Sequence, residues 1–221
     1  MNTIEEISNE AIKYGYEYIA ICDHSHGLPV VKGLSEGDIR KQMKQIEVIN
    51  RKLDDFTVLS GIELNVDKDG KLDIRDAVLQ DLDVVIASVH SGFKGDEKTI
   101  TNRVLKAMHN NNITILGHPT GRIINKRSPL QLDLIKIFET AANLGIIMEI
   151  NGFPDRLDLS DVNCYKARDF NLRFSIGTDS HQIKELSFMD FGVVTARRGW
   201  LERKDIINTL EIKDLKKMLK I

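Results

Sequence analysis

An alternation of short apolar runs with longer amphipathic stretches constrains the fold more than any other feature of the sequence. Six runs rich in valine and isoleucine predict strands, and their continuously apolar character is typical of strands buried on both faces. The repeated strand–helix alternation indicates parallel βαβ units and hence an α/β fold. The predicted strands cover 18–24, 57–64, 83–90, 113–119, 146–151 and 173–181, and the predicted helices cover 35–53, 96–112, 130–144, 160–171 and 204–219.

The chain begins with a helix pattern rather than with a strand. Asn2 or Thr3 is the expected N-cap, acidic residues fill the first turn, and Ile4, Ile7 and Ala11 form the apolar stripe. A parallel barrel whose first element is a helix lacks the strand that should precede it. No proline-rich, serine-rich or low-complexity linker interrupts the pattern, so residues 1–221 are expected to form one domain.

Composition narrows the class of protein. Hydrophobic residues make up 42% of the chain and charged residues 29%, which is ordinary for a soluble globular protein. The sequence contains no long apolar run and no secretory signal, and its two cysteines make no disulfide framework, so a cytoplasmic location is expected. A net charge of −2 argues against a strong nonspecific nucleic-acid binder, which would normally be basic.

Polar residues of metal-ligand type follow the apolar part of each predicted strand. The carboxyl ends of parallel strands meet at one face of an α/β barrel, where functional groups gather. Four of the six histidines lie at such ends, together with carboxylates. This mixture suits Zn²⁺, Mn²⁺ or Fe better than Ca²⁺ or Mg²⁺, and adjacent divalent ions can activate water for phosphoryl displacement. The strand ends are Asp23 with His24, Glu63, His90, His118, Asn151, and Asp179 with His181.

The sequence around these strand ends resembles the PHP (polymerase and histidinol phosphatase) family. The motifs that carry the resemblance occur in the family's order: DHS at 23–25, GIE at 61–63, SVH at 88–90, GHP at 117–119 and TDSH at 178–181. Three longer segments are most similar to the C-terminal PHP domain of bacterial and archaeal family X DNA polymerases: GHPTGR at 117–122, EINGFPDRLDL at 149–159 and ARRGWLERKDIINTL at 196–210. The resemblance covers nearly the whole chain.

This resemblance implies a distorted (β/α)7 barrel that holds up to three divalent ions, Zn²⁺ or Mn²⁺, at the carboxyl ends of its strands. The implied activity is phosphoester hydrolysis, directed in the polymerase branch at DNA 3′ ends. Glu63, His90, His118 and Asp179 would be catalytic. In the family's pattern Glu63 bridges metals one and two, His90 and His118 complete metal two, Asp179 belongs to metal one, and His24 and His181 belong to metal three.

The family's first motif, Asp-x-His-x-His, has no counterpart in this sequence. In the family it precedes a segment like NTIEE, which begins here at Asn2. That motif supplies three of the ligands that the resemblance implies, and these three are absent here. Only metal two keeps all of its expected ligands, so one complete metal site is expected. Without its first strand, the barrel is expected either to close as a smaller six-stranded barrel or to stay open between the strands that carry His24 and Asp179.

Three functions remain open on the sequence. The first is processing of DNA 3′ ends, such as 3′–5′ exonuclease activity, with a separate polymerase subunit as a partner. The second is hydrolysis of a small phosphomonoester, as in the histidinol-phosphatase branch, which the slightly acidic net charge favours. The third is a degenerate barrel that serves as a binding module without catalysis.

Several single residues near the strand ends could have either a functional or a structural role. Arg122 and Arg156 follow strand ends, where an arginine fork suits a substrate phosphate, or they form ordinary surface ion pairs. Asp23 is expected either to have a structural role or to orient the neighbouring ligand, Cys22 to be a small buried side chain, and Trp200 to anchor the last helix by packing.

Overall fold

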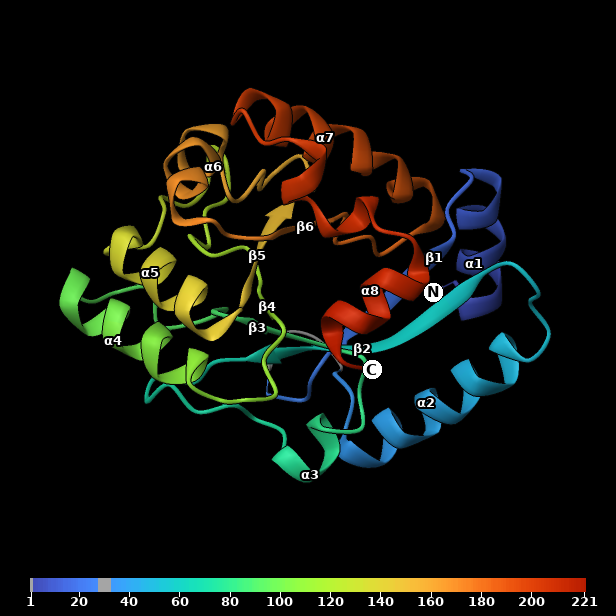
Figure 1. The fold of residues 1–221 in the computed structure, drawn as a ribbon. Coiled ribbons are helices and arrows are strands. Elements are labelled where there is room, and N and C mark those ends of the chain that lie inside the picture. Colours follow the sequence, from blue (N-terminus) through green and yellow to red (C-terminus); the bar gives the residue numbers. More distant parts are fainter. Residues whose placement is uncertain (1, 28–32) are drawn as a thin grey trace.

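Six parallel strands form one sheet in the computed structural model, which describes residues 2–27 and 33–221 (Figure 1). Their order across the sheet equals their order along the chain. The α/β fold predicted from the alternation is therefore confirmed. The strands are β1 (Tyr18–His24), β2 (Thr57–Asn65), β3 (Val84–Ser88), β4 (Ile115–Leu116), β5 (Ile147–Asn151) and β6 (Phe174–Gly177).

The sheet curls without closing. β1 pairs with β2 and β6 pairs with β5, but no pairing joins β1 to β6 within the described residues. This curled half-barrel matches the predicted PHP-type barrel with one strand missing. Of the two outcomes expected for the gap, the open sheet is the one observed, and closure as a six-stranded barrel is wrong.

The segment that follows Arg203 lies along the free edge of β6. Phe174 forms an isolated parallel bridge with Ile206. The Asn208 side chain accepts a hydrogen bond from Ile176 N at 2.7 Å and donates one to Ile176 O at 3.0 Å, as a neighbouring strand would. The Tyr18 hydroxyl, at the start of β1, lies 3.3 and 3.1 Å from two carbonyl oxygens of the same segment. Some of the backbone hydrogen-bonding groups along the open edge therefore have partners, although the sheet does not close.

Local signals place the starts of the first helices correctly. α1 (Ile4–Lys13) begins with a capping box between Thr3 and Glu6, and α2 (Glu36–Asn50) begins with one between Ser35 and Asp38. The sequence did not predict α3 (Asp76–Leu79) or α7 (Met189–Arg198). The other helices are α4 (Glu97–Met108), α5 (Leu134–Leu144), α6 (Asp161–Ala167) and α8 (Ile212–Leu219), with 3-10 helices η1 (Arg168–Phe170), η2 (Ile183–Phe188), η3 (Arg203–Asp205) and η4 (Ile207–Thr209).

Two expectations about the C-terminal region are wrong. The predicted helix over 204–219 begins only at Ile212, because Asn208 pairs with β6 and the residues around it form 3-10 turns. Trp200 does not anchor the last helix, since 70% of it is exposed. The neighbouring Leu201 is the residue that enters the main core.

The inner face of the sheet changes character along each strand. Alternate residues of a strand share a face, so Leu59 lies on the same face as Glu63. Near their amino ends, the strands contribute to a buried apolar cluster that α8 helps to close. This cluster forms a floor below the polar strand ends, and it comprises Leu59, Val84, Ile115, Ile147, Ile207 and Leu215.

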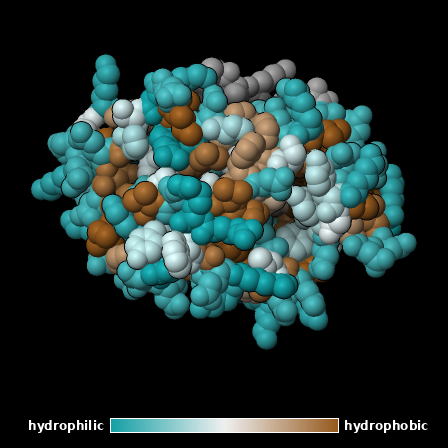
Figure 2. Space-filling model, turned by 90° about the horizontal axis from the view of Figure 1, so that it is seen from above, coloured by the Kyte–Doolittle hydropathy of each residue, from teal (hydrophilic) through white to brown (hydrophobic). Residues whose placement is uncertain are grey.

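Helices cover the outer face of the sheet (Figure 1). Ile100 and Val104 of α4 and Ile137 and Phe138 of α5 are buried in the main hydrophobic core. Figure 2 shows apolar side chains scattered among polar ones on the face that carries α6 and α7. Within residues 2–27 and 33–221, no helix combines the length and apolar character needed to cross a membrane.

Candidate metal centre

Parallel pairing brings the predicted ligands of the first strands together. His24, the last residue of β1, is in register with Glu63 of β2. His90 follows β3 by two residues, and His118 follows β4 by two residues. Because these strands are neighbours in the sheet, their carboxyl ends place the four side chains at one site.

The Glu63 carboxylate is the centre of this cluster. Its Oε1 lies 3.2 Å from His90 Nε2 and 2.9 Å from His118 Nε2, and its Oε2 lies 3.2 Å from His24 Nδ1. The ring centroid of His90 is 5.2 Å from that of His24 and 5.0 Å from that of His118. The two carboxylate oxygens thus face different histidines, as a bridging ligand would.

Several ring nitrogens in the cluster are buried without a hydrogen bond. His24 Nδ1 and both ring nitrogens of His90 and His118 have no aligned hydrogen-bond partner among the described residues. Three of these five nitrogens approach Glu63: His24 Nδ1, His90 Nε2 and His118 Nε2. A buried polar atom without a partner costs about 1–3 kcal/mol. Nitrogen lone pairs directed at a carboxylate are the donors that Zn²⁺ or Mn²⁺ uses, so these residues fit a divalent ion.

Charge and burial act in opposite directions on the ionisable groups of the cluster. Burial by itself would raise the pKa of Glu63, but the adjacent His118 and His90 hold that pKa well below its usual range. Burial lowers the pKa of His90. Burial also disfavours protonation of His118, but Glu63 outweighs it and raises the pKa of this ring. The carboxylate is therefore ionised and available as a ligand.

His24, Glu63 and His90 each offer a ligand atom, and these atoms lie within 4.8 Å of one another. The family's pattern instead assigns His24 to metal three, apart from His90. In this structure His24 faces the same carboxylate as His90 and His118. The assignment of individual ligands to individual ions remains a prediction.

Asp179 and His181 form a second group beside the first. Asp179 Oδ2 accepts hydrogen bonds from Arg156 Nε at 3.1 Å and from Asn151 Nδ2 at 3.2 Å. His181 Nδ1 lies 3.9 Å from Asp179 Oδ1, and the His181 ring is 6.1 Å from that of His24. The predicted ligand Asp179 is therefore held by an arginine and an amide in this structure.

Backbone strain also marks the site. His118 has a φ of +24° and Asp179 has a φ of +51°. A left-handed conformation at a residue other than glycine costs about 1–3 kcal/mol, and such residues cluster at functional sites. Two of the six predicted ligands carry this strain.

The two predicted phosphate-binding arginines differ in their contacts. Arg156 pairs with Asp179, and its Nη1 is buried without a partner among the described residues. Arg122 instead donates from Nε to Arg156 O at 2.7 Å and from Nη2 to Leu157 O. Arg122 thus holds the backbone of the loop that carries Arg156.

Glu149 of β5 was not predicted as a site residue from the sequence. Its Oε2 accepts a hydrogen bond from the backbone N of His118, and its Oε1 would lie 2.5 Å from a Cβ at Gly177. Burial raises the pKa of Glu149 to about 7. A charged residue within an otherwise apolar strand was the available signal, and Glu149 now joins the candidate residues as a support for His118.

Two residues next to the cluster have the structural roles expected of them. Asp23 accepts a hydrogen bond from Gln42 of α2, so it fixes β1 against that helix. Cys22 is half-buried as a residue, and burial raises the pKa of its thiol. In the metal-free protein this thiol is a small, neutral side chain.

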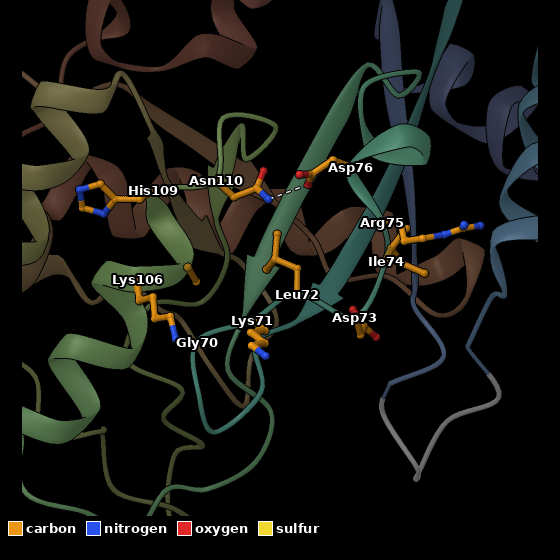
Figure 3. A pocket seen from close by; sticks show the side chains of 11 residues that line it. Gly70, Lys71, Leu72, Asp73, Ile74, Arg75, Asp76, Lys106, His109 and Asn110 are labelled. Carbon is orange, nitrogen blue, oxygen red and sulfur yellow. Dashed lines mark hydrogen bonds between the residues drawn. The ribbon is translucent and has the colours of Figure 1, made fainter.

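A surface pocket of 580 Å³ lies apart from this cluster (Figure 3). Its lining contains none of the six predicted ligands. It lies between the loop that follows β2 and the carboxyl end of α4, where Asn110 donates a hydrogen bond to Asp76 at 2.8 Å. The lining residues are Gly70, Lys71, Leu72, Asp73, Ile74, Arg75, Asp76, Lys106, Ala107, His109 and Asn110.

Comparison with known proteins places the chain among phosphoesterases. No family model matches the sequence. The chain is 38% identical over 218 residues to the DNA polymerase/3′-5′ exonuclease PolX of Bacillus subtilis (strain 168). The aligned region covers 99% of this chain and 38% of that protein. The chain thus spans less than half the length of this relative.

Shorter relatives match over most of their length. A probable phosphatase of Tolumonas auensis is 30% identical over 189 residues, which covers 81% of this chain and 72% of that protein. A probable phosphatase of Thermoanaerobacter sp. (strain X514) is 26% identical, with 99% of this chain and 88% of that protein covered.

A solved structure supports the fold. The crystal structure of histidinol phosphate phosphatase from Lactococcus lactis, complexed with zinc, L-histidinol and phosphate, matches with a TM-score of 0.64 and 18% identity. The match covers 91% of this chain and 89% of that one. This likeness shows the fold. The sequence relatives show that the chain belongs to the PHP family of phosphoesterases.

Proposed function

We propose that this chain is a metal-dependent phosphoesterase that acts on DNA 3′ ends. The convergence of three imidazole rings on the buried Glu63 carboxylate carries this proposal, because the ring nitrogens lack other partners. Zn²⁺ and Mn²⁺ both accept such nitrogen and oxygen donors. His24, Glu63, His90 and His118 would hold the first ion, and Asp179 with His181 would contribute beside it.

A divalent ion held there would supply Lewis acidity toward a phosphoester and would lower the pKa of a water molecule. The chain's own residues bind and orient the substrate. Arg156 has one buried guanidinium nitrogen without a partner among the described residues, which suits a phosphate oxygen. Asp179 fixes the other side of this guanidinium, and Arg122 holds the loop that carries it. The apolar floor below the site limits the access of water from beneath.

The substrate is inferred from the relatives. PolX of Bacillus subtilis, whose name includes 3′-5′ exonuclease, matches 99% of this chain, which supports DNA ends and a polymerase subunit as a partner. A second candidate, a small phosphomonoester, is supported by relatives named as phosphatases that match over 72% and 88% of their own length. The degenerate binding module is opposed by the ligand-like geometry around Glu63.

A paired assay separates these functions. We expect the purified protein with Mn²⁺ or Zn²⁺ to shorten a 3′-recessed DNA duplex faster than it hydrolyses p-nitrophenyl phosphate, and excess chelator to abolish both reactions. Hydrolysis of p-nitrophenyl phosphate alone would favour the small-substrate function. Absence of both reactions with the metal bound would favour the binding module.

Matched histidine variants make the assay specific to the site. His90→Ala removes a ring that faces Glu63 and should lower turnover at least about tenfold. His109→Ala removes a ring at the end of α4, where Nδ1 contacts Leu105 O at 2.7 Å, and should leave turnover unchanged. Equal activity of the two variants would contradict the proposed site.

A further inference from the structure

Arg103 of α4 has an unusual set of partners. Its side chain is buried, and its guanidinium donates to four backbone carbonyl oxygens. Nε lies 2.6 Å from Asp67 O and Nη2 lies 2.5 Å from Val66 O, while Nη1 lies 2.9 Å from Ser91 O and 3.2 Å from Gly92 O. One side chain therefore joins two loops that are distant in the sequence.

Both loops begin directly after strand ends of the candidate metal centre. Val66 lies three residues beyond Glu63, and Ser91 follows His90. Hydrogen bonds from a charged donor are about twice as strong as neutral ones, so this guanidinium fixes the spacing of the two loops more firmly than ordinary loop contacts do. Glu63 Oε1 and His90 Nε2 lie 3.2 Å apart, close to where these two loops leave their strands.

The loops are shaped to admit the guanidinium. Gly92 has a φ of +65°, and a Cβ there would lie 2.9 Å from Arg103 Nη1. Gly70 has a φ of +74°, and a Cβ there would lie 2.6 Å from Arg103 O. Figure 3 shows Gly70 and Lys71 close beside Lys106, which lies on α4 as Arg103 does. Gly92 therefore leaves room for the guanidinium, and Gly70 lets the loop after β2 approach the backbone of α4.

A purely structural role explains these contacts less well. Within residues 2–27 and 33–221 no carboxylate forms an ion pair with Arg103, and the Asp67 carboxylate accepts hydrogen bonds from Asp69 N and Lys71 N instead. A buried charge that has no ion-pair partner in direct contact is costly. Burial lowers the pKa of Arg103, in accord with that cost. A role in holding the loops after β2 and β3 at the candidate metal centre would account for the cost of burying this charge.

We infer that Arg103 is a positioning residue for the candidate metal centre: it clamps the loops after β2 and β3 so that Glu63 and His90 keep their mutual approach. The inference deepens the proposed function and rests on it. Arg103 does not touch the ion or the substrate in this role, and it acts through the backbone of the two loops.

Cobalt(II) titration of the metal-free protein tests the inference, because the visible absorption of Co²⁺ reports its coordination geometry. Arg103→Met should weaken Co²⁺ binding at least tenfold and change the absorption spectrum. Val104→Ala is the matched control, since Val104 is the next residue of α4 and is buried in the main core. It should lower the melting temperature but leave Co²⁺ affinity within about twofold and the spectrum unchanged.

A second variant covers the case in which Arg103→Met fails to fold. Gly92→Ala keeps the arginine and displaces the loop next to His90, so it should reproduce the change in Co²⁺ affinity and spectrum. Hydrogen exchange in the metal-free proteins adds an independent measurement. Segments 64–69 and 89–94 should lose protection together in both loop variants, and they should stay protected in Val104→Ala.

The outcomes separate this inference from the proposed function. Wild-type protein that binds no Co²⁺ would overturn the metal centre, and the exchange measurement would then still support or refute the clamp. Wild-type protein that binds Co²⁺, with Arg103→Met and Gly92→Ala binding it equally well, would overturn the positioning role. Loss of affinity in Val104→Ala equal to that in Arg103→Met would overturn it too, because stability alone would then explain the effect.

Discussion

Replacing Glu63 with glutamine should cost more activity than any other single change at the site. The substitution keeps the size of the side chain and removes its charge. Glu63 faces three imidazole rings at 2.9–3.2 Å, whereas His24 faces one carboxylate oxygen at 3.2 Å. The two positions therefore differ in how many ligand contacts depend on them.

This difference sets the expected magnitudes. If each contact contributes about 1.4 kcal/mol to transition-state stabilisation through the ion, it is worth about tenfold in rate. Glu63→Gln should then lower kcat/KM by about three orders of magnitude, and His24→Ala by about one. Initial rates at matched metal concentrations measure both, and circular dichroism checks that each variant is folded. Equal losses in the two variants, or an active Glu63→Gln protein, would refute the assignment of Glu63 as the central ligand.

Three further predictions concern other parts of the molecule. Asn208→Ala leaves the Ile176 N–H and C=O without their side-chain partner, so urea denaturation should show a loss of about 1–3 kcal/mol in the free energy of unfolding; an unchanged midpoint would show that the edge of β6 needs no cover. Arg122→Ala removes two charged donors that hold the loop carrying Arg156, and a hydrogen bond to a charged group is worth about 1.5–3 kcal/mol, so KM should rise at least about tenfold with a smaller change in kcat; a fall in kcat alone would contradict a positioning role. Burial raises the pKa of Cys164 to about 12, so this thiol should resist a disulfide reagent at neutral pH until the protein unfolds, as peptide mass spectrometry can show; rapid labelling of native protein would contradict its burial.

Features encoded by neighbouring residues could be predicted from the sequence. The Thr3 cap of α1 pairs with Glu6, three residues later, and such a short-range pattern can be recognised in the sequence alone. The apolar runs predicted six strands, because parallel strands buried on both faces need such runs. β4 is nevertheless only Ile115–Leu116, and the backbone takes a positive φ two residues later, at His118.

Features that depend on distant contacts could not be predicted. Asn208 delays the start of the predicted helix over 204–219 because it pairs with β6, about thirty residues earlier in the chain. The pairing of Arg156 with Asp179 and the support of Arg122 for its loop also arise only when separate strands meet. Glu149 could have been noticed as a charge within a buried strand, but its contact with the backbone of His118 required the fold. Periodicity carries no information about such pairs.

Metal content after exhaustive dialysis tests the central claim most directly. The claim is that Glu63, with the histidines that face it, forms one complete site for a divalent ion, while the ligands of the other family sites are incomplete. Elemental analysis should find about one tightly held ion per chain in the wild-type protein and in His109→Ala, and none in Glu63→Gln. A wild-type protein without metal, or a Glu63→Gln protein that retains a full ion, would contradict the account.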